Sequence, residues 1–400
     1  MSVTWLRGNA LTLLENGADF FPALQAAIDA AEAEIFLETY IFANDETGHC
    51  IAAALRRAAA RDVTVRLMVD GFGGREFVAT LMDDLVEAGV NVLIYRREVA
   101  QLSLRRHRLR RLHRKLAVID GRIAFVGGIN IISDFGTANH NAPRQDYSVR
   151  IEGPLLGPIH GTVTRVWELV TWASFRRRPR LPASPAVHPE PCGDVEAGFL
   201  IRDNIRHRND ILNAYLDAIE QAQSEILIAN AYFMPGVRFG RALYAAAQRG
   251  VRIIVLLQGK TDHQLLRYAT QALYATALRA GIRIFEYEKS FMHAKVAVID
   301  DDWATVGSSN IDPFSLLLAK EANIVVRDAR FAGELRAHLE AAIVAGARAM
   351  CPVDIQRQPW PKRLLRWASY GLVRLLVGIA GYGDRHWRAE DRVSQDPPPR

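Results

Sequence analysis

The chain has 400 residues, of which 50% are hydrophobic and 24% are charged, and its formal net charge is +6. This composition can support two domains with full apolar cores and excludes a chain that is disordered throughout. The positive charge favours anionic partners such as nucleic acid, phosphorylated metabolites or an anionic membrane surface, without choosing among them.

No secretory signal and no membrane-spanning segment is predicted. Residues 1–17 lack a charged start followed by an uninterrupted apolar stretch, and no apolar run reaches about twenty residues. Cys50, Cys192 and Cys351 are far apart and form no CxxC or metal-ligand spacing. This cysteine usage argues against a disulfide framework and indicates a reducing compartment.

The chain repeats itself in order along its length. The matching stretches are 27–42 with 218–233, 54–71 with 242–259, and 85–95 with 277–287. In each half an alanine-rich helical pattern precedes a β-branched run, twice over, which is typical of βαβ units around a largely parallel sheet. We therefore expect an α/β fold made of two domains of one ancestry.

The predicted boundary between the domains lies in a proline-rich stretch. Residues 176–194 hold five prolines and show no hydrophobic periodicity, which predicts an extended linker, with an ordered loop over the domain interface as the alternative. The first domain then covers residues 1–175 and the second covers 195–345. Residues 346–400 form a C-terminal tail.

A polar motif occurs at the same place in both halves. Its members are His113, Lys115, Asp120 and Asn130 in the first half, and His293, Lys295, Asp300 and Asn310 in the second. A histidine and a lysine two positions apart on a strand share one face, so each pair is predicted to face a common ligand. The alternative, ordinary buried residues, would require the same coincidence twice.

The aspartates of the motif admit a second interpretation. Asp120 and Asp300 each follow a β-branched run at a predicted hairpin turn, where an aspartate can close the turn and cap backbone amides away from any ligand. Small residues precede both asparagines and would let a ligand approach the backbone closely. The two motifs together predict a divided site.

This paired HxKxxxxD motif resembles the signature of the phospholipase D superfamily, and the likeness extends over residues 10–345. The stretches 306–316 and 321–328 are similar in particular to the bacterial cardiolipin synthases, in the form without two N-terminal membrane helices. The resemblance implies two tandem phospholipase D-like α/β domains related by pseudo-two-fold symmetry. It places the active site at their interface.

The residue types of the motif suit attack on a phosphodiester. One neutral imidazole can attack phosphorus while the other, protonated, donates to the leaving oxygen. The two lysines and two asparagines can stabilise the phosphate oxygens, so neither a metal nor another cofactor is predicted. As members of the motif, Asp120 and Asp300 belong to the predicted catalytic set. The resemblance implies that His113 attacks and His293 donates, although the symmetry of the motifs leaves the order open.

In this superfamily each catalytic histidine is paired with an acidic residue that orients its ring. The resemblance assigns Glu321 to this position in the second half, eleven residues after Asn310. The first half departs from the pattern, and its nearest candidate is Asp146, sixteen residues after Asn130.

Two further segments bear on the substrate. Residues 96–115 carry nine Lys or Arg against one Glu, either as a solvated loop or as a guide for anionic head groups or nucleic acid beside the site. In residues 362–383, helical spacing puts Arg363, Arg366, Tyr370 and Arg374 on one face. Such a helix either lies in a membrane interface with this face toward the head groups or packs on the second domain.

The sequence thus predicts a cardiolipin synthase-type phosphatidyltransferase that acts through a phosphohistidine and transfers to the hydroxyl of phosphatidylglycerol. The resemblance allows phosphatidylglycerol or phosphatidylethanolamine as donor. The predicted partners are these phospholipids and an anionic membrane surface, without nucleic acid, and the predicted location is the cytoplasmic face of the cell membrane as a peripheral protein. The alternatives are a hydrolase or nuclease of the same superfamily and, ranked lower, a non-catalytic membrane adaptor.

Overall fold

A computed structural model describes residues 3–96, 111–135, 142–173, 184, 187, 189–203, 206–259, 264–312, 319–353 and 359–377. Most of the predicted linker 176–194, most of the basic stretch 96–115, and the tail beyond residue 377 lie outside these ranges.

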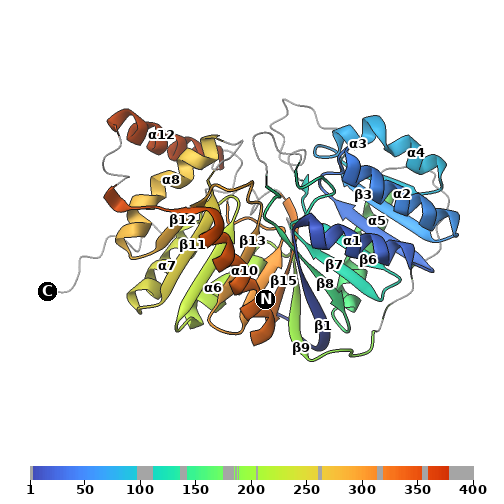
Figure 1. The fold of residues 1–400 in the computed structure, drawn as a ribbon, viewed down its shortest axis with the longest axis horizontal. Helices are drawn as coiled ribbons and strands as arrows, with labels where there is room; N and C mark the ends of the chain where they lie inside the picture. Colours follow the sequence, from blue (N-terminus) through green and yellow to red (C-terminus); the bar gives the residue numbers. More distant parts are fainter. Residues whose placement is uncertain are drawn as a thin grey trace.

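The protein is an α/β fold with two similar halves side by side (Figure 1). The strands of the first half are β1 (Leu6–Glu15), β2 (Glu34–Thr39), β3 (Thr64–Asp70), β4 (Asn91–Tyr95), β5 (Arg111–Leu112), β6 (Lys115–Ile119), β7 (Ile123–Gly127) and β8 (Tyr147–Glu152). Its helices are α1 (Asn16–Asp29), α2 (Glu46–Ala60), α3 (Arg75–Thr80), α4 (Met82–Glu87) and α5 (Leu156–Ala173).

The second half repeats this order from residue 195. Its strands are β9 (Val195–Arg202), β10 (Glu225–Asn230), β11 (Arg252–Gln258), β12 (Arg283–Tyr287), β13 (Lys295–Ile299), β14 (Trp303–Gly307), β15 (Ala319–Arg327) and β16 (Ala347–Ala349). Its helices are α6 (Asp210–Gln221), α7 (Val237–Gln248), α8 (Gln264–Arg279), α10 (Ala329–Gly346) and α12 (Trp360–Val377).

The strands of both halves join one sheet, and their order shows the internal symmetry. Outward from the centre, the first half runs β1-β8-β7-β6-β2-β3-β4 and the second runs β9-β15-β14-β13-β10-β11-β12. The two series meet where β1 pairs antiparallel with β9. The outer strands β2-β3-β4 and β10-β11-β12 are parallel, as the βαβ pattern predicts, whereas the strands around the motifs are antiparallel.

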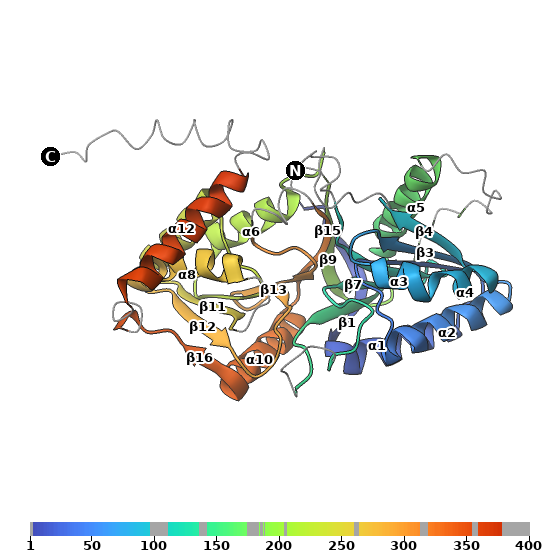
Figure 2. The same ribbon diagram turned by 90° about the horizontal axis from the view of Figure 1, so that it is seen from above.

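Helices cover both faces of the sheet (Figure 2). In the first half, α1 to α4 lie on one face and α5 on the other; in the second half, α6 to α8 and α10 are divided in the same way. Strands such as β6 and β13 are buried along their whole length, which explains their nearly continuous apolar sequences. One apolar cluster, which includes Val149, Ile159, Val296 and Leu335, runs through both halves. The halves therefore share a core.

Helix α12 packs outside α8, and this corrects part of the predicted orientation of the tail. Tyr370 packs against an apolar cluster with buried Val373, and Arg366 is half-buried beside them. The interfacial orientation put Arg366 and Tyr370 toward the head groups, so that orientation is wrong for these two residues. The opposite side of the helix is apolar and exposed at Trp360, Leu364, Leu365, Trp367, Leu372 and Leu375. None of the helices in the described part of the chain has the length and apolar character needed to cross a membrane.

The motif aspartates sit at the turns that follow β6 and β13. The Asp120 carboxylate accepts the backbone N–H groups of residues 32–34 at 2.8 Å, and the Asp300 carboxylate accepts those of residues 223–225 at 2.8–3.0 Å. Both residues have positive φ, +51° and +48°, a conformation that aspartate tolerates better than most residues. Each carboxylate thus ties a hairpin to the start of the neighbouring antiparallel strand, β2 or β10, at the end of β6 or β13 opposite the motif lysine.

We expect Asp120→Asn to lower the free energy of unfolding by about 1–2 kcal/mol, because asparagine keeps the backbone conformation but loses the charge and one acceptor oxygen. Urea unfolding measures this change, with the exposed α6 variant Asp217→Asn as control. The turnover number at a temperature where both variants are folded should be unchanged. A large loss of turnover in Asp120→Asn alone would instead place this carboxylate in the catalytic set.

Candidate active site

Each motif histidine is held by a carboxylate from the opposite half of the chain. His113 Nδ1 lies 3.0 Å from Glu321 Oε1, and His293 Nδ1 lies 2.7 Å from Asp146 Oδ2. The acid side chains are 0% and 6% exposed, while the histidine side chains keep 17% and 15% exposure. The carboxylates are therefore shielded behind the rings, and the rings remain accessible.

Backbone pairing across the interface produces this crossed arrangement. The His113 N–H donates to Lys320 O at 3.0 Å, where β5 runs parallel to β15, and the His293 N–H donates to Gln145 O at 2.8 Å. Lys320 and Gln145 directly precede Glu321 and Asp146, so the two acids occupy equivalent places. The departure seen in the first half is one of spacing along the chain, since Asp146 reaches the corresponding position in space.

The two acids have different neighbouring residues, and each neighbour suits the size of its acid. Ser308 donates its hydroxyl to Glu321 Oε2. The first half has Gly128 at the corresponding position, and a Cβ there would lie 2.3 Å from Asp146 Oδ1. Asp146 instead receives the backbone N–H of Tyr147 at 2.9 Å. A glycine at position 128 is thus required by the close approach of this carboxylate.

The two motif lysines are buried in the same region. Lys295 is 0% and Lys115 is 5% exposed, and each Nζ donates to the carbonyl oxygen of the histidine two residues earlier, at 2.6 Å for Lys115. Burial lowers the pKa of Lys115 to about 7 and that of Lys295 to about 8, against the opposing attraction of Glu321 and Asp146. These ammonium groups are held where an added anion would stabilise their charge.

Burial and nearby charges shift the pKa values of the two acids and of His293. Burial raises the pKa values of Asp146 and Glu321, but nearby lysine and histidine charges together with hydrogen bonds bring both below the ordinary range. Burial, and then the charge of Lys295, lower the pKa of His293 to about 3. An ionised carboxylate accepts from Nδ1–H, so the Nε2 atom is the one left to meet a ligand.

Each motif asparagine follows the motif histidine of its own half in the sequence, and both asparagines are buried. Asn130 is 5% and Asn310 is 4% exposed, on the segments that leave β7 and β14. Asn130 Oδ1 accepts the backbone N–H of Ile41 at 3.1 Å. Because its oxygen is used in this way, the side-chain amide of Asn130 can offer only its N–H₂ donors to a phosphate.

Two further positioning residues were not predicted. Asp70 Oδ2 accepts the N–H of Leu112 at 2.8 Å, and Gln258 Oε1 accepts the N–H of Met292 at 2.5 Å. Each acceptor ends a parallel strand and holds the residue just before a motif histidine. The repeat contained this signal, because 54–71 and 242–259 align Asp70 with Gln258 directly before a glycine.

Tyr40 is another unpredicted member of the site, and it belongs to the first half only. Its ring centroid lies 5.0 Å from that of His113, and Lys115 Nζ lies 5.6 Å from it. Burial, and then the charge of Asp70, raise the pKa of Tyr40 to about 12, so its hydroxyl stays protonated. The aligned residue of the second half is Ala231.

The site offers nitrogen donors rather than a set of metal ligands. Both of its histidine-bound carboxylates face Nδ1 atoms, and in the described part of the chain no group of three or more His, Cys, Asp or Glu side chains is arranged to hold a metal ion. The chemistry available from these residues is imidazole attack, imidazole proton transfer and binding of an anion by ammonium groups.

Known proteins share both this sequence and this fold. Residues 24–142 and 215–343 match the family described as "Cardiolipin synthase, PLD-like domain". The chain is 37% identical over 399 residues to cardiolipin synthase B of Shigella flexneri and 36% identical to that of Escherichia coli K12, covering 100% of this chain and 95% of each relative.

The fold also matches a solved structure of low sequence identity. The phosphatidylserine synthase of Haemophilus influenzae superposes with a TM-score of 0.66 at 14% identity, over 94% of this chain and 97% of that one. The two family matches contain the two histidine–lysine motifs, one in each half of the sheet. With its whole length aligned to curated relatives, the chain belongs to the phospholipase D superfamily, within its cardiolipin synthase family.

Proposed function

We propose that this protein is a phosphatidyltransferase that makes cardiolipin by moving a phosphatidyl group from one phospholipid to a hydroxyl of phosphatidylglycerol. The observation that carries the proposal is the crossed pair of histidines, each with Nδ1 on a buried carboxylate, beside two buried lysines. The full-length likeness to proteins named cardiolipin synthase B supports the choice of substrate class.

The first half-reaction needs one neutral histidine and one protonated histidine. A neutral Nε2 attacks the phosphorus of the donor lipid, and the bond from phosphorus to the head-group oxygen breaks. The second histidine, protonated, gives its proton to that oxygen. Lys115, Lys295 and the asparagine amides stabilise the phosphate oxygens as negative charge shifts during the step.

The second half-reaction reverses these roles on the acceptor. The deprotonated histidine removes the proton from a hydroxyl of phosphatidylglycerol, whose oxygen attacks phosphorus while the phosphorus–nitrogen bond breaks. Water in place of this hydroxyl would make the same site a hydrolase. A site that excludes water from the phosphohistidine therefore favours transfer.

The next question is which of the two histidines attacks phosphorus and which donates the proton. The resemblance implies His113 as nucleophile and His293 as acid. In the unliganded site the lowered pKa of His293 favours the reverse, because it keeps this imidazole neutral near pH 7. A bound phosphodiester adds negative charge beside His293 and raises its pKa. Mapping the phosphatidylated histidine by mass spectrometry assigns the order.

The proposed setting is the surface of an anionic membrane, at its cytoplasmic face, with the protein bound peripherally. The exposed apolar side of α12 carries Trp360 and Trp367, and Lys362 and Arg374 are also exposed on this helix. Aromatic and leucine side chains insert at the head-group boundary, while basic side chains bind anionic lipids. The net charge of +6 acts in the same direction.

We expect purified protein to form cardiolipin from phosphatidylglycerol vesicles in the presence of a chelator, with His113→Ala and His293→Ala each inactive. Glu321→Gln and Asp146→Asn should each lower the turnover number by roughly a hundredfold or more, because the imidazole loses its orienting charge. Glu220→Gln, an exposed change on α6, is the control.

Lipid analysis with and without phosphatidylethanolamine gives the readout for these variants. Undiminished cardiolipin formation in either histidine variant contradicts the mechanism. Phosphatidic acid as the main product, or rapid cleavage of soluble diesters without vesicles, identifies the hydrolase or nuclease alternative. No product at all from the wild-type protein leaves the adaptor alternative.

We expect sulfate, which stays a dianion in this range, to bind the site with an affinity that falls about tenfold or more from pH 7 to pH 9. The pKa values of Lys115 and Lys295 in the empty site are about 7 and about 8, so above these values an anion binds only if the lysines take up protons. Calorimetry in buffers of different ionisation enthalpy should show this proton uptake. Lys295→Ala should reduce it, and the exposed Lys362→Ala should not; equal uptake in both variants would contradict the assignment.

We expect the double variant Leu364→Glu/Leu375→Glu to bind anionic vesicles at least tenfold more weakly, because two exposed leucines lose their burial in the interface and add like charge. Vesicle co-sedimentation measures this. Val344→Glu on α10, where the side chain is 89% exposed, is a matched control and should bind as the wild type does. Equal binding by all three proteins would remove α12 from the membrane contact.

A further inference from the structure

The second half contains an apolar cavity of about 270 Å³ between α7 and α8. Side chains of Leu243, Val255, Leu273 and Ile284 line it, from both helices and from β11 and β12. Tyr370 of α12 lines it from outside the helix pair. Apolar cavities of about 150 Å³ already admit a benzene-sized ligand, so this one has room for a longer hydrocarbon segment.

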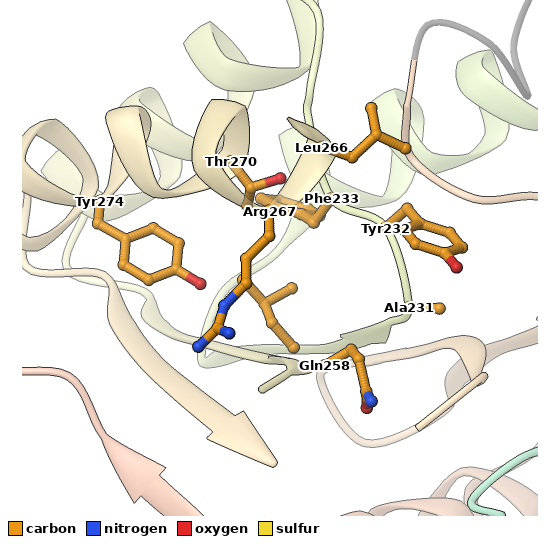
Figure 3. Close-up of a pocket in the computed structure, with 9 residues that line it drawn as sticks. Ala231, Tyr232, Phe233, Gln258, Leu266, Arg267, Thr270 and Tyr274 are labelled. Carbon is orange, nitrogen blue, oxygen red and sulfur yellow. The ribbon is translucent and has the colours of Figure 1, made fainter. Parts of the chain in front are cut away.

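A smaller pocket of about 20 Å³ leads from this cavity toward the active site. The two share the lining residues Phe233, Leu257, Thr270 and Tyr274, so they lie next to each other. Figure 3 shows the small pocket, with Arg267, Thr270 and Tyr274 on the helix side, Ala231 and Gln258 at the ends of the strands, and the Arg267 side chain extending from the helix toward the strand side.

The strand end of the small pocket touches the histidine motif through the backbone. The Ala231 N–H donates to Ala294 O at 2.9 Å, between His293 and Lys295, and the Gln258 side chain holds Met292. From this end inward the lining changes from polar, with Gln258 and the guanidinium group of Arg267, to the mainly apolar cavity. This change from polar to apolar lining matches the change along a phospholipid molecule, from its polar phosphate to its apolar acyl chains.

The first half differs in sequence at the corresponding place. Tyr40 stands where the second half has Ala231, and its ring lies over His113 and Lys115. Behind it, Phe42 packs against the fully buried Phe77, with ring centroids 5.0 Å apart. The first half therefore has the aromatic ring of Tyr40 where the second half has Ala231, whereas Phe42 and the aligned Phe233 are aromatic in both halves.

We propose that the cavity between α7 and α8 holds one acyl chain of a phospholipid whose phosphate is bound at the paired histidines. This inference rests on the proposed function and adds to it a binding site for the hydrocarbon part of a substrate. The chain enters beside Ala231, passes Phe233 and Thr270, and ends among the leucine, valine and isoleucine side chains. The phosphate thereby lies next to His293, and the acyl chain moves out of the membrane into the cavity.

Gly240 on α7 provides a direct test, because it lines the cavity and a Cβ built there meets no atom within 4 Å. A phenylalanine at this position would fill the cavity without a backbone clash. Gly333 on α10 is a matched control, since it is a half-buried helical glycine whose Cβ also meets nothing within 4 Å and it does not line the cavity.

We expect Gly240→Phe to lower the kcat/KM for dioleoyl phosphatidylglycerol relative to dihexanoyl phosphatidylglycerol by about tenfold, because part of the long chain loses its apolar site. Gly333→Phe should leave this ratio unchanged. Thermal unfolding of both variants, and of the smaller Gly240→Leu, shows whether the fold is kept. An unchanged ratio in a folded Gly240→Phe protein overturns the proposal.

A binding measurement separates this proposal from the proposed function. Full-length protein is photolysed with phosphatidylglycerol vesicles that carry a diazirine near the end of one acyl chain, and labelled peptides are mapped. Label in residues 237–248 or 264–279, lost in Gly240→Phe, supports the acyl-chain site even if the protein makes no cardiolipin, which would refute only the proposed function. Cardiolipin formation with label confined to residues of α12 other than Tyr370, which lines the cavity, overturns the acyl-chain site and leaves the function intact.

Discussion

The crossed hydrogen bonds between histidine and carboxylate are the interaction on which the rest of the site depends. His113 is held by Glu321 and His293 by Asp146, so neither half of the chain contains a complete histidine pair. The same crossing is built into the backbone, where the carbonyl group of the residue directly before each acid accepts the N–H of the opposite histidine. Separating the halves would leave both buried carboxylates without their partners, a costly state in an apolar interior.

This constraint also explains why polar groups are tolerated so deep in the protein. Two lysines, two acids and two histidines are concentrated at one seam, and their charges offset one another only in part, since burial still lowers the pKa of both lysines. In the proposed function, a phosphodiester supplies the missing negative charge. The site is thus most stable when occupied by an anion, and its affinity for that anion is coupled to protonation.

Some of the sequence differences between the two halves occur together and compensate for one another. The buried ion pair of Arg114 and Glu38 in the first half corresponds in the repeat to Ala294 and Ala229, so both charges are absent together. Tyr40, whose ring lies against His113, corresponds to Ala231, which lines the small pocket of the second half. In the proposed function the pseudo-symmetry serves the phosphate chemistry, and the proposed acyl-chain site lies in the half that departs from it.

The sequence by itself determined the α/β class, the repeat and the identity of the histidines, lysines and asparagines, because local periodicity and a motif present twice are properties of neighbouring residues. It could not determine that the acids act across the seam, that Asp70 and Gln258 hold the histidine segments, or that Arg366 lies toward α8. Those relations join residues far apart in the chain, and only packing of the completed sheet brings them within hydrogen-bonding distance.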